Sequence, residues 1–418
     1  MADKFEIPLD IPQVKIEKVE TNRQGEIIIT VVSTEEGTHC HLCGRRTTQR
    51  YSHDHPITLR HLSILGKKTY IRIAPVRYAC RHCKGKKGRP ATTTQKLSWY
   101  EPRSPHTKAY EEHVLLSLVN STVEDVSIKE ELGYEAVMGS IQRHLASEVD
   151  WRAFRRLGVL GIDEISLKKG HQDFVVIVTA RIGDVVHIVA VLEDRKKETV
   201  KQFLARIPKR LRRTIKAVCS DMYEGFINAV KEVLGVRVIV DRFHVAKLYR
   251  KELDDLRKRE LRRLKKALSE EAYRQLKGSM WILRKRPEVL TTEEREVLNC
   301  LFPHSPALKV AYELCNELTD LFEQDLVRSR ARSKILRWKA RVKKAAPRCF
   351  NTFLSTLDKY FDEITNYFIS RNTSGFVEGL NNKIKVIKRR CYGLLNTEHL
   401  FQRIHLDLLG YTLFGRKG

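Results

Sequence analysis

The chain has 418 residues, too many for one ordinary domain, and 42% of them are hydrophobic, which is enough to build real cores. Its formal net charge of +27 goes far beyond what solubility needs, so a polyanionic partner such as nucleic acid is favoured over a merely basic surface. Nowhere do apolar residues form the run of roughly 18 that a membrane span requires, and no secretory signal is visible, so we expect a cytoplasmic protein without a membrane partner.

The first module, residues 1–100, carries a cysteine pattern. Four of the nine cysteines form two Cys-x-x-Cys pairs, Cys40 with Cys43 and Cys80 with Cys83, and the other five are scattered. This spacing is typical of one tetrahedral zinc site, whereas a redox pair would need a thioredoxin-like βαβ context that is absent. Four thiolates leave no position open for water, so the Zn²⁺ is expected to be structural. Alternating residues between the pairs predict a zinc-ribbon-like β-hairpin with a glycine turn.

The second module, residues 105–150, is predicted to be a helix-turn-helix DNA-binding domain. A first helix with an apolar stripe precedes a second helix, which a capping box from Ser121 to Glu124 is expected to open, and a glycine turn leads to a third helix. The third helix would enter the DNA groove and present Gln142 and Arg143 to it. A plain three-helix packing domain is the alternative.

The third module begins near residue 157, where the order of predicted elements becomes informative. Three strands are followed by a helix, a strand, a helix and a last strand, which is the order of a ribonuclease-H-like α/β fold. Asp163 ends the first of these strands and Asp221 ends the fourth, and these two strands are neighbours in such a sheet. The two carboxylates are therefore expected to face each other.

Helical and heavily charged sequence follows over residues 246–369. Within it, residues 327–348 hold ten Lys or Arg and no acid, which favours a surface that contacts the DNA backbone. Another predicted helix then carries Glu378. The chain is thus expected to be a multidomain α/β protein, in which an all-helical insertion interrupts a catalytic domain made of residues 157–245 and 370–410.

Asp163, Asp221 and Glu378 would then form one site of three carboxylates. An acid at a strand end is usually a solvated turn residue, but three acids on matching elements of one fold are a much rarer coincidence. Hard oxygen ligands select Mg²⁺ or Mn²⁺ over zinc, and two such ions catalyse in-line displacement at phosphorus. The predicted chemistry is therefore phosphoryl transfer, with water or a DNA 3′-hydroxyl as the nucleophile.

The sequence around these acids resembles the ISL3 family of bacterial insertion-sequence transposases, which have an Asp-Asp-Glu (DDE) active site. The matching stretches are GIDEISLKKGHQDF, CSDMYEGF, VIVDRFHVAKL and SGFVEGLNNKIKVIKRRCYGL, together with the CHLCG and CRHCKG cysteine knuckles. The resemblance covers residues 38–410. It implies binding of double-stranded DNA at terminal inverted repeats, cleavage at the element ends and joining of 3′-OH ends to target DNA in the bacterial nucleoid. Bringing two ends together makes a homodimer the natural expectation.

Several other polar residues are candidates for supporting roles near these acids. Asp241 and His244 fall in one of the matching blocks, and Asp241 is expected to position DNA or the carboxylates rather than to bind metal directly. His171 is expected either to approach the scissile phosphate or to hold a turn. Glu164 should point to the opposite face from Asp163, because side chains alternate along a strand.

DNA contacts are predicted along the helix that carries Glu378, because residues 378, 382, 385 and 389 share one face by helical spacing. A solvated basic face is the alternative. In the helical insertion, Trp281 or Trp338 is a candidate to stack on a flipped base, although most tryptophans belong to a core. The predicted DNA-contacting residues outside the helix-turn-helix are Lys169, Trp281, Asn382, Lys385, Lys388 and Arg389.

Two other functions fit parts of the sequence. A catalytically silent zinc and helix-turn-helix regulator would use the same positive charge, but it has no need of three metal-binding acids. A structure-specific nuclease would share the metal site without recognising terminal repeats.

Overall fold

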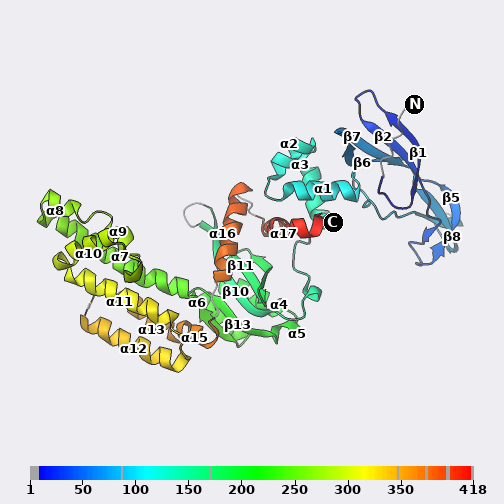
Figure 1. The fold of residues 1–418 in the computed structure, drawn as a ribbon. Coiled ribbons are helices and arrows are strands. Elements are labelled where there is room, and N and C mark those ends of the chain that lie inside the picture. The colour runs from blue at the N-terminus through cyan, green and yellow to red at the C-terminus, as the bar shows by residue number, and fades with distance from the viewer. Residues whose placement is uncertain are drawn as a thin grey trace. The chain divides into compact units, whose positions relative to one another are not determined.

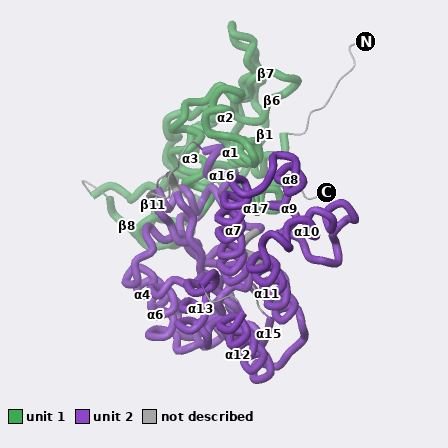
Figure 2. The backbone as a smooth tube through the Cα atoms, turned by 90° about the vertical axis from the view of Figure 1, so that its left-hand side faces the viewer, with its two compact units in different colours: residues 1–145, 405–418 green, residues 146–404 purple. Residues whose placement is uncertain are grey.

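The fold is given by a computed structural model that describes residues 9–85, 88–168, 172–345, 348–371, 375–391 and 396–415 (Figure 1). Side chains of residues 167–168, 172–173 and 375–378 are outside this description. The chain divides into two compact units, shown in Figure 2: unit 1 contains residues 1–145 and 405–418, and unit 2 contains residues 146–404. Among the helices described, none combines the length and the apolar character needed to cross a membrane.

The N-terminal part of unit 1 is made of β-sheets. A four-stranded sheet has the order β1-β2-β7-β6, a three-stranded sheet has the order β5-β8-β9, and β3 pairs with β4. β6 and β7 form an antiparallel hairpin, as the alternating sequence predicted, and its turn holds Leu65 and Gly66 at φ of +50° and +75°. The strands are β1 (Val14–Thr21), β2 (Ile27–Ser33), β3 (Thr38–His39), β4 (Arg46–Thr47), β5 (Gln49–His53), β6 (Ile57–Ile64), β7 (Lys67–Ile73), β8 (Val76–Lys84) and β9 (Pro90–Thr94).

Short helices form the rest of unit 1. Thr122, not Ser121, caps the second of them: its hydroxyl oxygen accepts a hydrogen bond from the Asp125 N–H (2.9 Å), so the N-cap lies one residue later than predicted. The helices are α1 (Lys108–Leu118), α2 (Val123–Glu130), α3 (Tyr134–His144) and, from His405 onward, the end of α17 (Thr397–Phe414). Their common core contains Val114, Leu118, Val126, Val137, Ile141 and Leu406.

Unit 2 is built on a five-stranded mixed sheet of order β12-β11-β10-β13-β14. β10, β11 and β12 are antiparallel neighbours, whereas β13 runs parallel to β10 and β14 runs parallel to β13. The first and fourth of these strands are therefore adjacent. The strands are β10 (Gly158–Lys168), β11 (Gln172–Ile182), β12 (Val185–Leu192), β13 (Ile215–Ser220) and β14 (Arg237–Val240).

The two faces of this sheet are covered differently, because alternate residues of a strand point to opposite sides. Val218 of β13 belongs to a core that includes residues of α4 (Lys197–Arg206) and α6 (Glu224–Val233). Its neighbours Ala217 and Cys219 belong instead to the core of the helical region that follows β14. The short α5 (Lys209–Arg212) precedes β13.

This helical region begins directly after β14 with α7 (Arg242–Ala267). Its C-terminal end packs again against the domain that contains the sheet. There, Asn366 Nδ2 donates a hydrogen bond to the Val238 carbonyl (2.8 Å), and Lys231 pairs with Glu363 (2.5 Å). The helices between are α8 (Glu270–Arg274), α9 (Ser279–Ile282), α10 (Thr292–His304), α11 (Pro306–Glu323), α12 (Arg328–Ala345), α13 (Asn351–Lys359), α14 (Phe361–Thr365) and α15 (Tyr367–Ser370). After this return, α16 (Gly375–Arg390) packs against β10 (Figure 1).

Candidate functional site

A cavity of about 1160 Å³ in unit 2 is lined mainly by residues of the sheet, α7, α11 and α16. Four of its five acids lie on or directly after strands, namely Asp163, Glu164, Asp221 and Asp241, and the fifth, Glu323, ends α11. Most of its basic residues lie on α7 and α16: Arg242, His244, Lys247, Arg250, Lys385, Lys388 and Arg389. The cavity thus offers carboxylates to a cation and, around them, positive side chains to a phosphate.

Asp163 lies in the middle of β10, not at its end as the sequence suggested. The strand continues to Lys168 because it stays paired with β11, whereas its parallel pairing with β13 ends at Ile162. Asp163 Oδ1 accepts a hydrogen bond from the Glu164 N–H (2.8 Å), and Oδ2 accepts one from Asn381 Nδ2. Burial raises the pKa of this carboxyl group.

Asp221 directly follows β13, and its Oδ1 accepts a hydrogen bond from the Tyr223 N–H (3.2 Å). Burial raises the pKa of Asp221 to about 6; the charge of His244 opposes this rise, and the charges of Asp163 and Glu164 add to it. Two aspartates that are far apart in the sequence therefore line one cavity and act on each other electrostatically.

These two carboxylates suit a divalent cation. Buried carboxylates whose charges repel each other are held partly against ionisation, and a bound cation removes that cost. Their oxygens are also the donor type that hard cations prefer. The described part of the site thus fits a divalent metal ion.

Three predicted site residues lie wholly or partly outside the described part of the chain. Glu378 is on α16, one turn before Asn381, but its side chain is not described. Lys169 and His171 lie between β10 and β11, outside the described residues altogether. The roles of all three stay predictions.

The face that α16 turns to the cavity differs from the predicted one. Lys385, Lys388 and Arg389 line the cavity, as expected, but the asparagine beside them is Asn381, which is 3% exposed. Asn382 is exposed and is not part of the lining. Counting back from Lys388 in steps of three and four would have found Asn381, whereas counting four residues forward from the glutamate selected its neighbour.

Lys388 does not present its amino group freely to solvent. Its Nζ donates a hydrogen bond to the Ser166 carbonyl of β10, 2.6 Å away, and burial lowers the pKa of this lysine. The contact joins α16 to the strand that carries Asp163.

The other supporting residues also lie at the cavity. Asp241 is 2% exposed and caps α7, because its Oδ1 accepts a hydrogen bond from the Phe243 N–H (2.9 Å). His244, in the first turn of α7, lines the cavity. Glu164 was expected on the opposite face, but it lines the cavity as well and pairs with Arg195 (3.2 Å).

The two tryptophans of the helical region have different environments. Trp338 is fully buried and donates a hydrogen bond from Nε1 to the Leu314 carbonyl (2.9 Å), so it belongs to the core. Trp281 is 62% exposed, and the Arg284 guanidinium lies 5.1 Å from the centre of its ring. Of the two, Trp281 is the one available for stacking.

The basic stretch that contains α12 makes ion pairs with acids of neighbouring helices, and its contact with the DNA backbone stays a prediction. Arg328 and Arg332 both pair with Asp362, at 2.8 and 2.5 Å. Arg341 pairs with Glu317. Part of this charge is thus compensated by acids on neighbouring helices.

The two Cys-x-x-Cys pairs of unit 1 come together in one cluster. The four Sγ atoms, of Cys40, Cys43, Cys80 and Cys83, all lie within 4.8 Å of one another. Main-chain N–H groups of Cys43 and Leu42 lower the pKa of Cys40 to about 6, which favours the thiolate that binds metal. Four thiolates at this spacing suggest a structural metal site.

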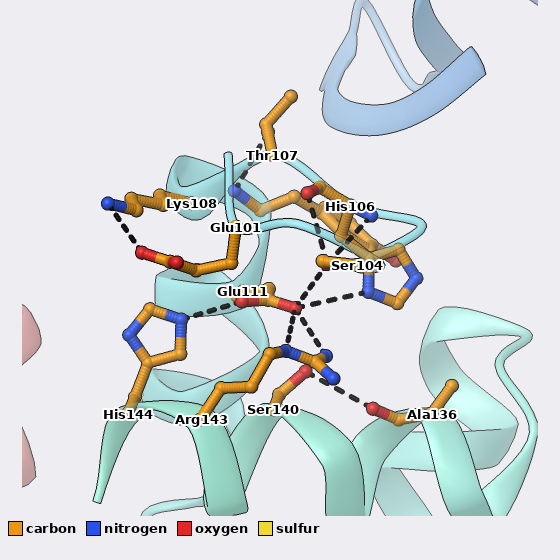
Figure 3. A network of polar contacts seen from close by, with 11 residues as sticks. Glu101, Ser104, His106, Thr107, Lys108, Glu111, Ala136, Ser140, Arg143 and His144 are labelled. Carbon is orange, nitrogen blue, oxygen red and sulfur yellow. Dashed lines mark hydrogen bonds and ion pairs between the residues drawn. The ribbon is translucent and has the colours of Figure 1, made fainter. Parts of the chain in front are cut away.

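A buried carboxylate organises the helices of unit 1 (Figure 3). Glu111 of α1 accepts hydrogen bonds from Arg143 Nε (2.9 Å) and Ser104 Oγ (2.7 Å), and His144 Nε2 lies 2.6 Å from its other oxygen. Burial alone would raise the pKa of Glu111, but hydrogen bonds from His106, His144 and Arg143 outweigh it and hold that pKa far below its usual range.

This network gives Arg143 a role that its sequence did not predict. Its guanidinium group was expected to contact DNA, but it holds α3 against α1 through Glu111. Gln142, the other predicted DNA contact on α3, is exposed.

Comparison with known proteins gives a consistent result. Residues 160–404, more than half of the chain and including all three predicted acids, match the model of the ISL3 family of DDE transposases, described as "Transposase". The chain is 27% identical over 376 residues to the transposase for insertion sequence element IS1001 of Bordetella parapertussis, with 89% of each chain covered. It is 23% identical over 348 residues to the transposase for insertion sequence element IS1557 of Mycobacterium tuberculosis, with 78% of this chain and 77% of that protein covered.

Proposed function

This chain belongs to the ISL3 family of DDE transposases and is thus an enzyme of DNA transposition, and we propose that it acts on the terminal inverted repeats of its own insertion sequence. It would bind these repeats, cleave DNA at the element ends and join the 3′-OH ends to target DNA. The observation that supports this most is the cavity in which Asp163 and Asp221 lie among basic side chains.

In this proposal, Asp163, Asp221 and Glu378 hold the catalytic Mg²⁺ or Mn²⁺. The metal, when bound, activates the attacking oxygen and stabilises the leaving one. The strand order β12-β11-β10-β13-β14 supports a ribonuclease-H-like catalytic domain of residues 157–245 and 370–410, because the strands of both aspartates are neighbours in it. Residues 246–369 are then its helical insertion.

Basic side chains of the cavity are proposed to hold the DNA backbone close to the acids. Lys385 and Arg389 line the cavity on α16. Lys247 lines it on α7 and has no carboxylate partner among the described residues. The exposed ring of Trp281, with the Arg284 guanidinium over it, supports stacking on a base beside the cleaved end.

Unit 1 is proposed to recognise the element ends. The four cysteines would bind one structural Zn²⁺ in a β module of residues 1–100, and α2 and α3 would act as a helix-turn-helix within residues 105–150 that presents Gln142 to DNA. Two copies of the chain would bring two ends together, so we expect a homodimer on DNA.

The experiment that tests the proposal is cleavage of labelled inverted-repeat DNA in Mg²⁺ or Mn²⁺. Asp163→Asn, Asp221→Asn and Glu378→Gln should each reduce cleavage and strand transfer to background and leave repeat binding without divalent metal unchanged. Asp184→Asn, in an exposed turn, is the matched control and should cleave like the unmodified protein.

Each other outcome has a definite meaning. A variant that keeps full cleavage removes its residue from the site. Repeat binding without any cleavage by the unmodified protein would favour a regulator. Equal cleavage of repeat and random duplex would favour a structure-specific nuclease.

A further inference from the structure

Two side chains of α16 make hydrogen bonds to β10. Asn381 Nδ2 donates to Asp163 Oδ2, and Lys388 Nζ donates to the Ser166 carbonyl, 2.6 Å away. Seven residues of helix rise roughly 10.5 Å, and three residues of strand span roughly 10 Å. The two spacings match, so both contacts form at once when the helix runs alongside the strand.

The amide of Asn381 has one orientation that satisfies its neighbour. The ionised carboxylate of Asp163 accepts hydrogen bonds and cannot donate them, so the amide must turn its NH₂ group toward it. The Oδ1 atom is then buried and finds no hydrogen-bond partner in the described part of the chain. Such an arrangement costs free energy, and it occurs at a residue that lines the cavity of the proposed site.

Lys388 likewise gives up contact with water to make a hydrogen bond to β10. A lysine that served only to attract phosphate would keep its amino group in water, as the exposed Lys383 does on the same helix. The amino group of Lys388 is partly withdrawn from water and is directed at a main-chain carbonyl of β10. Its hydrogen bond therefore fixes the helix to the strand.

We propose that Asn381 and Lys388 are positioning residues, which fix the register of α16 on β10 and orient the Asp163 carboxylate. Because Glu378 lies three residues before Asn381 on the same helix, that register also sets where the main chain of residue 378 lies along β10. This inference rests on the proposed function and adds to it the contacts that hold α16 on the strand of Asp163. A positioning residue acts on metal binding and turnover, whereas a DNA contact acts on DNA affinity.

Asn381→Ala is the first test. We expect a loss of about 10–100-fold in kcat and a similar rise in the Mn²⁺ concentration for half-maximal cleavage, which is typical when a partner of a metal ligand is removed. The Kd for repeat DNA without metal should stay within about twofold, since binding of DNA does not use this contact. Asn351→Ala, at an exposed asparagine of α13, is the matched control and should change none of these values.

Asn381→Asp separates positioning from direct metal binding. The aspartate has the same shape, but it loses the donor and adds a negative charge beside Asp163, so we expect it to be at least as impaired as Asn381→Ala. If it instead kept or improved Mn²⁺ affinity, Asn381 would be a metal ligand through its oxygen, and the positioning role would be wrong.

Lys388→Met tests the second contact, since methionine keeps most of the apolar stem and loses the donor. We expect kcat to fall by about tenfold or more, with the salt dependence of DNA binding unchanged. A decrease of about 1 in the slope of log K against log salt would instead identify Lys388 as a phosphate contact and overturn its part of the inference. Lys383→Met is the exposed control for kcat.

The variants of the three acids and those of Asn381 and Lys388 together separate a wrong positioning role from a wrong active site. Thermal unfolding first confirms that each variant is folded. If the Asp163, Asp221 and Glu378 variants lose cleavage while Asn381→Ala and Lys388→Met cleave normally, only the positioning role is wrong. If the three acid variants cleave normally, the proposed site itself is wrong.

Discussion

Asp221 carries a stability cost that follows from the burial of its carboxylate. Burial raises its pKa from 3.8 to about 6, so its ionised form is disfavoured in the folded protein without metal. The folded chain then binds a proton on Asp221 more tightly than the unfolded chain does. Stability of the metal-free protein therefore falls as pH rises through this window.

Asp221→Asn should consequently stabilise the protein when no Mg²⁺ or Mn²⁺ is added. We expect a gain of up to about 3 kcal/mol in the free energy of unfolding at pH 8, and about half of that at pH 5. Urea unfolding at both pH values measures it, with Asp184→Asn as the reference. A gain that does not depend on pH would show that burial of the charge is not its cause.

Added Mn²⁺ should reverse this difference in stability between Asp221→Asn and the unmodified protein. Only the unmodified protein keeps both aspartate ligands, so a binding cation should raise its unfolding temperature more than that of Asp221→Asn. A thermal-shift titration at pH 8 measures the difference. Equal shifts in both proteins would mean that Asp221 does not bind the ion.

Single residues also show where sequence reasoning reaches its limit. Asp163 and Asp221 were found because apolar, β-branched runs precede both, and the sheet does bring them to one cavity. Asn381 was missed because helical spacing allows steps of either three or four residues, so both Asn381 and Asn382 share a face with the glutamate. Packing against β10 decides between them, and this packing is not visible in a helical pattern.

At the scale of elements, Glu111 ties α1, α3 and the preceding loop together. Its pKa is held low in the folded state, so its contribution to stability is present above the usual carboxyl range and is lost as pH falls through the lowered value. Removing its charge leaves the Arg143 guanidinium group without its carboxylate partner. We expect this carboxylate to be the main polar determinant of the helical module.

Glu111→Gln should lower the free energy of unfolding of unit 1 by about 1–3 kcal/mol at pH 7, because the buried carboxylate loses its charge-assisted hydrogen bonds. It should also weaken binding of repeat DNA, since α3 loses its anchor. Glu112→Gln, the exposed neighbour, should change neither. Circular dichroism melting and a binding titration check both, and a normal melting curve for Glu111→Gln would contradict the role of the network.

The elements themselves differed in how far their sequences predicted them. The strands and helices of the five-stranded sheet followed from alternating and helical periodicity, since each is a local signal. The ion pairs of α12 were not predicted, because its acidic partners Asp362 and Glu317 lie on other helices. The continuation of β10 past Asp163 likewise depends on pairing with β11, which a buried apolar run does not reveal.

The whole molecule is expected to unfold in two steps, because it has two compact units with separate cores. Around the four cysteines the core is small: it contains Cys40, Cys80 and Ala91, with Cys83 packed against it. A module with so little apolar core depends on its metal for stability. Removal of zinc should thus lower the thermal stability of unit 1 and leave that of unit 2 unchanged.

A thiol-reactive reagent or a strong chelator should release one zinc ion per chain and shift one calorimetric transition to lower temperature, with the other unchanged. Limited proteolysis should then cut within residues 9–100 first. Cys40→Ser should reproduce the effect, and Cys300→Ser, at an exposed cysteine outside the cluster, is the matched control. Loss of both transitions together would contradict the independence of the units.

The end of α17 completes unit 1, although the rest of that unit is formed by the first 145 residues. Leu406 is fully buried in its helical core, and Asp407 Oδ1 accepts a hydrogen bond from the Asn120 N–H (2.7 Å). Packing is so close that a Cβ atom on Gly410 would lie 2.6 Å from Val119 Cγ2.

This arrangement links the function of the chain to its complete translation. On the ribosome, the helical core of unit 1 has to wait for residues 405–415, which are synthesised after the entire sheet and helical region of unit 2. A gene copy damaged by a premature stop codon before Leu406 would give a product in which the helical core of unit 1 is unfinished. We therefore expect decayed copies of the element to yield fragments that proteases clear, instead of stable competitors that occupy the ends of an intact copy.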